Sequence, residues 1–159
     1  MKSGSLPIPT RETAELEGFS EASPAKEINA TLLTVKWEQA QAESLGGKVV
    51  QLQPRELGVW AGHFSLEELD ELVIPKRTLA RRKARHEALT VEESDKALRL
   101  ARVSSEADRV FGDPAKSSRW LRKPNAALAG NRPLDLLKSE TGSRAIDELL
   151  GQIDHGMFN

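Results

Sequence analysis

The stretch that decides the fold is PKRTLARRKARH, at residues 75–86. It contains no acid, and its cations are Lys76, Arg77, Arg81, Arg82, Lys83 and Arg85. The preceding segment, SLEELDELV at 65–73, is acidic on its polar face and repeats leucine at helical spacing. An acidic amphipathic helix, a short turn at Ile74 and Pro75 and then a basic helix are typical of a helix-turn-helix whose second helix faces nucleic acid.

The composition indicates a protein that concentrates positive charge locally. The 159 residues carry a formal net charge of −1, so the basic stretch is a patch and not part of a general positive surface. Cysteine is absent, which excludes disulfides and thiolate metal sites and favours an intracellular protein. The first residues lack the apolar core of a signal peptide, and no apolar run approaches the ~18 residues of a membrane span. We therefore expect a cytoplasmic protein without a membrane partner.

The chain before the basic stretch predicts a leader and one long helix. Residues 1–24 mix Ser, Pro, Gly and Glu with few apolar residues, which predicts a flexible leader. Apolar residues at helical spacing predict a helix over 25–45 that ends at Gly46 and Gly47. Residues 48–52 allow a short strand, although a helix starting at Pro54 is the better supported element of this region.

The chain after the basic stretch predicts further helices and an all-α fold. Ser65 with Glu68 and Thr90 with Glu93 have the spacing of capping boxes, which mark helix starts on both sides of the basic stretch. The helix after Thr90 is predicted to end at Gly112. We accordingly divide the chain into a helix-turn-helix domain at 25–112 and a second helical domain at 113–159. The last helix of the second domain has a narrow apolar stripe formed by Ile146, Leu149, Leu150 and Ile153.

The basic stretch has two interpretations. From composition alone, a solvated surface helix is as good an interpretation as a DNA-reading helix. The cations follow one helical flank, while Leu79, Ala80 and Ala84 could supply small apolar contacts toward the preceding helix. In a helix-turn-helix the residues near the helix start reach base edges and the longer cations reach phosphates. We therefore predict base contacts for Arg77, Thr78 and Arg81, and phosphate contacts for Lys76, Arg82, Lys83 and Arg85.

Catalysis finds little support in the sequence. The three histidines, His63, His86 and His155, are isolated and lack metal-ligand spacing. The Gly46-Gly47 pair lacks the remaining residues of a phosphate-binding loop. We predict a protein that is not an enzyme and uses no cofactor or metal.

Several motifs in order resemble one known family. They are RTLARRK at 77–83, TVEESDKALRLARV at 90–103, Val-Phe-Gly at 110–112 and WLRKPNAALAGNRPLDLLKSETG at 120–142. The chain resembles the Xre/MbcA/ParS antitoxins over about 64–156. The resemblance implies an Xre-type helix-turn-helix domain that represses the operon, followed by a small helical domain that binds a toxin.

The resemblance also implies the partner and the inhibitory site. The family's partners are RES-domain toxins, which consume NAD, and the end of the antitoxin's C-terminal domain covers the toxin's active-site cleft. That role falls here on the helix over 145–154 and on the tail, which gives the candidate toxin-binding residues Ile153, Asp154, His155, Gly156, Met157, Phe158 and Asn159. Met157 and Phe158 are apolar and lie beyond a glycine that stops the helix, so either they are frayed or they insert into a partner.

Three hypotheses follow. The first is a type II antitoxin that neutralises a RES-domain toxin by steric occlusion and represses its own operon. The second is a stand-alone transcription regulator whose C-terminal domain serves for dimerisation, and the third is a structural scaffold. Under the first two, a homodimer presents two basic helices about 34 Å apart to palindromic operator DNA.

Overall fold

Every regular secondary-structure element that the computed structural model describes is a helix. The described residues are 24–157, with side chains described at 35–58 and 63–157, so the predicted leader at 1–24 lies almost wholly outside them. The elements, with η for 3-10 helices, are α1 (Pro24–Leu45), η1 (Pro54–Gly62), α2 (Leu66–Leu72), α3 (Lys76–Arg85), α4 (Val91–Phe111), α5 (Pro114–Arg122), η2 (Ala126–Leu128), α6 (Pro133–Leu136) and α7 (Glu140–Asp154). The all-α expectation is confirmed.

The helix ends lie where the local sequence signals place them. Both capping boxes are present: the side chains of Ser65 and Thr90 accept hydrogen bonds from the backbone three residues on, and the two glutamates there bond back to the cap. Gly112 closes α4 with φ +62°, a left-handed conformation that glycine adopts without strain. The predicted helices at 25–45, 65–73 and after Thr90 are thus confirmed.

The short strand considered for residues 48–52 is wrong. This segment has no regular secondary structure, and no strand lies elsewhere in the described range. Its backbone bonds instead to the start of α4: Leu52 N donates to Ser94 Oγ at 3.0 Å, and Leu52 O accepts from Leu89 N at 2.9 Å. A strand needs a neighbouring strand to pair with, and this part of the chain lies among helices.

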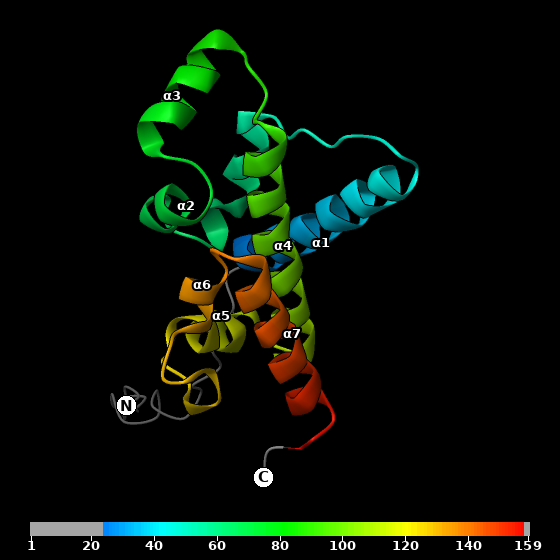
Figure 1. Ribbon diagram of the computed structural model, residues 1–159, viewed down its shortest axis with the longest axis vertical. Coiled ribbons are helices and arrows are strands. Elements are labelled where there is room, and N and C mark those ends of the chain that lie inside the picture. The colour runs from blue at the N-terminus through cyan, green and yellow to red at the C-terminus, as the bar shows by residue number, and fades with distance from the viewer. Residues whose placement is uncertain (1–23, 158–159) are drawn as a thin grey trace, which may run out of the picture.

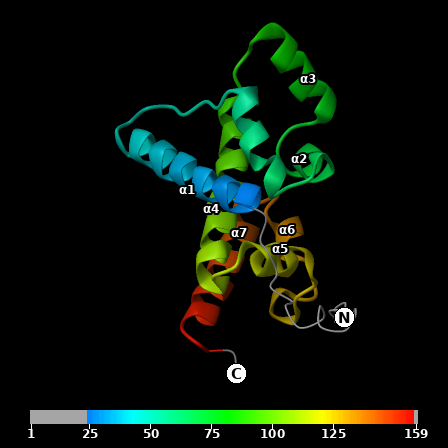
Figure 2. The ribbon, with the colours of Figure 1, turned by 180° about the vertical axis from the view of Figure 1, so that it is seen from behind.

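Helix α4 is the central helix of the hydrophobic core. α1 crosses its middle, as Figure 2 shows, while α5 and α7 pack along its C-terminal half. Ala97, Ala101 and Ala107 of α4 are fully buried, and such small side chains allow neighbouring helices to approach closely. The apolar core is one cluster that runs from Ala40 of α1 to Leu150 of α7. α4 therefore joins the region before Gly112 to the region after it.

Polar contacts also connect the two regions. The guanidinium of Arg122 in α5 forms two hydrogen bonds of 2.7 and 2.8 Å with the Glu68 carboxylate of α2. A third bond, of 2.6 Å, reaches the His63 carbonyl oxygen. Glu68 is also the capping-box residue of α2, so α5 fixes the start of the helix-turn-helix. Arg99 and Glu140 form a further ion pair of 3.2 Å between α4 and α7.

The molecule is elongated, with α3 at one end and the end of α7 at the other. In Figure 1 these two elements lie at opposite ends of the longest axis. None of the described helices combines the length and the apolar character that crossing a membrane requires.

Candidate functional site

Two carboxylates of α2 hold the start of α3. The backbone N–H of Lys76, the first residue of α3, donates to the Asp70 carboxylate, and the Lys76 ammonium lies 2.9 Å from the Glu67 carboxylate. The latter bond lowers the pKa of Glu67 and raises the pKa of Lys76. Ile74, in the turn between the helices, is fully buried. The turn therefore fixes the direction in which α3 leaves the body of the protein.

α3 presents most of its cations to solvent. Arg77, Arg81, Lys83 and Arg85 are exposed, Thr78 is half-buried, and none of the residues of α3 is fully buried. In the described part of the chain, the ion pairs of this helix are those of Lys76, Arg82 and Arg85, the last at 3.8 Å from Glu87. Arg77, Arg81 and Lys83 thus carry charge that no acid of the described chain neutralises.

Arg82 differs from the other cations of the set. Its side chain is only 14% exposed, and its guanidinium lies 3.0 Å from the Glu93 carboxylate and 3.2 Å from the Ala88 carbonyl oxygen. Arg82 thus ties α3 to the start of α4, which favours a structural role over the predicted phosphate contact. The apolar contacts considered for Ala80 and Ala84 are wrong, because both are exposed. Of the three residues considered, Leu79 alone packs against the core.

The C-terminal end of α7 is the second candidate site. Ile146, Leu149 and Leu150 are buried against the core, and Ile153 packs at its edge, which confirms the predicted apolar stripe. The helix then ends in a turn in which Gly156, at φ +68°, donates to Ile153 O and Met157 donates to Gln152 O. Met157 is 66% exposed. Phe158 and Asn159 lie outside the described residues.

The last turn of α7 is held to α4 by an ion-pair cluster. Arg109 of α4 donates to the carboxylates of Glu106 and Asp154 at 2.7 and 2.8 Å. These bonds lower the pKa values of Glu106 and Asp154. Asp154, His155 and Met157 are all exposed just beyond this anchor. Among the described residues of the predicted toxin-binding set, only Ile153 is partly withdrawn from solvent.

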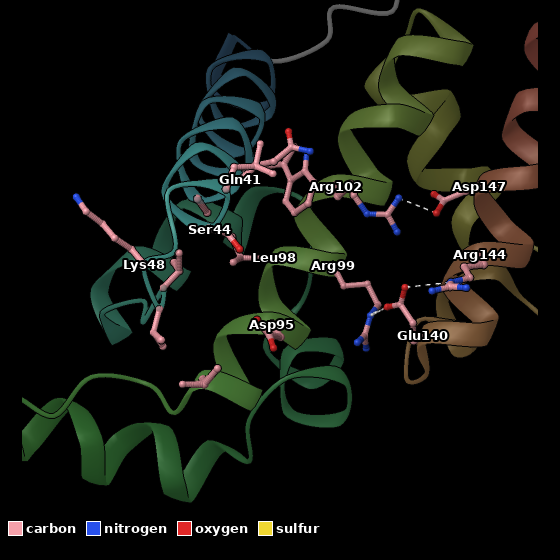
Figure 3. Close-up of a pocket in the computed structure, with 16 residues that line it drawn as sticks. Gln41, Ser44, Lys48, Asp95, Leu98, Arg99, Arg102, Glu140, Arg144 and Asp147 are labelled. Carbon is pink, nitrogen blue, oxygen red and sulfur yellow. Dashed lines mark hydrogen bonds and ion pairs between the residues drawn. The ribbon is translucent and has the colours of Figure 1, made fainter.

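A hollow of about 750 Å³ lies between α1, α4 and α7, and Figure 3 shows how its charges are arranged. Arg102 pairs with Asp147 at 2.6 Å, and Glu140 pairs with Arg99 and Arg144 at 3.2 and 3.4 Å. Arg102 also lies 5.9 Å from the centre of the Trp37 ring. Each of these arginines already has a carboxylate partner. We therefore interpret the charges that line the hollow as contacts that hold the three helices together.

A metal site finds no support in the described residues. They contain no group of three or more histidines, cysteines or acids arranged to hold a metal ion. His63 has an acidic neighbour that the sequence did not reveal, since its Nε2 lies 3.9 Å from the Asp108 carboxylate. Burial raises the pKa of Asp108, while a hydrogen bond from Ser117 opposes that shift.

Comparison with known proteins finds a family match for the helix-turn-helix region and another for the C-terminal region. Residues 61–102 match the Antitoxin Xre-like helix-turn-helix domain, and residues 106–156 match the Antitoxin Xre/MbcA/ParS C-terminal toxin-binding domain. A protein named Antitoxin Xre from Yersinia enterocolitica is 35% identical over 102 residues, which are 64% of this chain and 69% of the relative. The chain belongs to the Xre/MbcA/ParS antitoxin family.

Two other antitoxins are similar to this chain over part of its length. Antitoxin Xre of Pseudomonas putida is 40% identical over 84 residues, and these are 53% of each of the two chains. The Prs ADP-ribosylating antitoxin of a Sphingobium species is 33% identical over 98 residues, which are 56% of this chain and 62% of the relative. The chain thus spans about half the length of the Pseudomonas antitoxin. The two family matches meet within α4, the helix that both regions share.

Proposed function

We propose that this member of the Xre/MbcA/ParS antitoxins neutralises a RES-domain toxin that consumes NAD. The end of α7 and the tail cover the toxin's active-site cleft, and no catalytic step is required of this chain. The observation that carries the proposal is the exposed Met157, which follows an anchored helix end in a domain whose family model is described as toxin-binding. The name of the Sphingobium relative gives further support, since ADP-ribosylation draws on NAD.

The proposed occlusion has a definite energetic scale. Full burial of a methionine side chain contributes roughly 1.5 to 3 kcal/mol. A loss of 1.4 kcal/mol weakens binding about tenfold, so removal of this side chain should weaken the complex by about 10- to 100-fold. The anchor from Arg109 to Asp154 favours binding as well, because it orders the helix end before the toxin arrives.

Co-expression with the adjacent toxin gene tests this proposal with a matched pair of variants. Met157→Ala should reduce growth rescue and the amount of toxin that co-purifies. Leu66→Ala truncates a similarly exposed apolar side chain, 60% exposed, at the start of α2 and should leave both unchanged. If Met157→Ala and a chain ending at 156 both protect cells fully, the tail does not occlude the cleft.

We propose further that α3 binds operator DNA in the promoter of the antitoxin's own operon. Arg77, Thr78 and Arg81 would read bases, and Lys76, Lys83 and Arg85 would contact phosphates, with a homodimer on a palindromic site. The support is the group of unneutralised cations on α3 and the match to a helix-turn-helix domain. Replacing one phosphate-binding cation by alanine should lower the slope of log affinity against log salt by about 0.9.

Binding to the upstream DNA, followed by fluorescence anisotropy, tests the second proposal. Arg77→Ala and Arg81→Ala should lower affinity, and a scrambled duplex should bind more weakly than the operator. If DNA binds with operator specificity but no toxin co-purifies, the chain is a stand-alone regulator. If neither partner binds, both parts of the proposal fail.

A further inference from the structure

A basic pocket lies beside α3, at the end away from the turn. It has a volume of about 370 Å³, and its lining comes from the start of η1 with the residue before it and from the end of α3 with its C-cap: Gln53, Pro54, Arg55, Arg82, Lys83 and His86. Three of these six side chains are cations, and none is an acid. The residues of η1 and α3 that meet here are about 30 positions apart in the chain, so only the tertiary structure forms the pocket.

The charges of the pocket are unequal. Arg82 forms part of the wall, and Glu93 already neutralises its guanidinium. Arg55 and Lys83 are both exposed, and neither forms an ion pair within the described ranges 35–58 and 63–157. The pocket therefore has an excess of positive charge that comes from one residue of η1 and one residue of α3.

The nearby helix end does not oppose an anion as strongly as a bare C-terminus would. The last carbonyl groups of α3 are capped: Glu87 N donates to Arg82 O at 3.0 Å, and His86 N donates to Lys83 O at 3.3 Å. His86 closes the helix in the left-handed conformation, with φ +54°. The partial negative charge of the helix end is thus partly satisfied by backbone donors and by its own basic residues.

The position of the pocket indicates which anion it binds. α3 has ten residues and is therefore roughly 15 Å long. The major groove is about 12 Å wide, so a helix whose first residues reach base edges brings its other end to the groove edge, where the phosphate backbone runs. An arginine guanidinium and a lysine ammonium are the groups that bind phosphate oxygens best.

We propose that this pocket holds one phosphodiester of the DNA backbone, bound between Arg55 and Lys83. This inference rests on the proposed DNA binding of α3 and adds a contact outside the basic stretch, on the element that precedes the helix-turn-helix. Arg55 and Lys83 clamp the backbone at one groove edge, while Arg77 lies in the first turn of α3, at the opposite end of that helix. The clamp fixes how deeply α3 enters the groove.

The test measures the salt dependence of operator binding by the full chain. Arg55→Ala should lower the slope of log affinity against log salt by about 0.9, so that from 50 to 200 mM salt the wild type loses about 3.5-fold more affinity than the variant. Arg55→Lys keeps the charge and should keep the slope. Lys116→Ala removes an exposed cation of α5 and serves as the matched control, with an unchanged slope expected.

A DNA-side experiment identifies the phosphate itself. Operator duplexes that carry one neutral methylphosphonate at successive positions are bound to the wild type and to Arg55→Ala. At one position per half-site, the substitution should weaken the wild type but leave Arg55→Ala unaffected, because the variant has no charge there to pair with the phosphate. Additive losses at every position overturn the clamp, even if the Arg77→Ala and Arg81→Ala variants confirm DNA binding.

Two further outcomes distinguish the clamp from the proposed function. If the wild type binds no duplex, the proposed DNA binding fails and the clamp fails with it. If NMR titration with inorganic phosphate shifts the His86 ring resonances while Arg55→Ala leaves the operator slope unchanged, the pocket binds a free anion and the DNA assignment is overturned. A lowered slope for Arg55→Ala, with thermal stability equal to that of the wild type, supports the clamp.

Discussion

Gly142→Ala should destabilise the protein because α7 passes very close to α6 at this position. The backbone N–H of Gly142 donates to the Ser139 cap at 3.0 Å. A Cβ added there would overlap the Leu136 carbonyl oxygen and would lie 2.9 Å from both the carbonyl carbon and the Cβ of Leu136. The obstacle is backbone, which cannot rotate away as a flexible side chain can. The α6–α7 corner must therefore move.

The size of the effect follows from two opposing contributions. Overpacking of this kind costs typically ~1 to 3 kcal/mol, and we expect the upper part of that range because backbone is displaced. Replacing glycine by alanine within a helix returns about 1 kcal/mol. The net loss should be about 2 kcal/mol, which for a chain of this size lowers the melting temperature by roughly 4 to 8 °C.

Gly151→Ala is the matched control, since it makes the same chemical change in the same helix. An added Cβ at Gly151 meets no atom within 4 Å. Only the gain in helix propensity remains, so this variant should be more stable by about 0.5 to 1 kcal/mol. Thermal and urea unfolding of both variants, followed by circular dichroism, gives the sign of the change in stability for each variant. If Gly142→Ala is as stable as Gly151→Ala, the close approach of α7 to α6 is not present in solution.

Three other predictions concern the contacts of the fold. In a double-mutant cycle of Arg122→Met and Glu68→Gln, the coupling energy from urea unfolding should be about 1 to 2 kcal/mol, and a value near zero would remove this tie between α5 and α2. Arg109 lowers the pKa of Asp154, so the stabilisation from this ion pair should be fully present above the ordinary pKa of an aspartate and lost as the pH falls through the lowered pKa. The difference in melting temperature between the wild type and Arg109→Gln should therefore vanish at acidic pH. A difference that does not change with pH would contradict this prediction. Leu150→Ala, at a fully buried side chain, should cost about 3 kcal/mol in urea unfolding, whereas a loss under 1 kcal/mol would place Leu150 outside a rigid core.

Much of the local structure could be predicted from the sequence because its signals are short-range. A capping box joins residues three apart, and an apolar stripe repeats every three or four residues, so Ser65, Thr90 and Gly112 determine helix ends almost independently of the rest of the chain. The same reasoning finds α3 and its row of cations. The strand that residues 48–52 allowed, as the weaker alternative, did not form, because pairing depends on a neighbour that the segment itself does not specify.

The role of each cation could not be predicted from the sequence. Arg81 and Arg82 are adjacent and have the same chemistry, yet one is exposed and the other is tied to Glu93 of α4. Their directions differ by about 100° around the helix, and only the packing of α3 on α4 determines which direction meets a carboxylate. Arg55 could not be predicted either, although it is exposed beside α3 in the folded protein. A lone arginine outside the basic stretch has no neighbouring residues that indicate a role.

The sequence by itself therefore determined an all-α chain with a basic helix near its middle and an amphipathic helix near its end, because those properties reside in neighbouring residues. The tertiary structure alone decided that these helices lie at opposite ends of the molecule, as Figure 1 shows, and that α4 joins them through one core. It also brought Arg122 to Glu68 and Arg55 to Lys83. The physical reason is range: contacts between residues tens of positions apart depend on how whole helices pack, and side-chain packing fixes that only when the chain has folded.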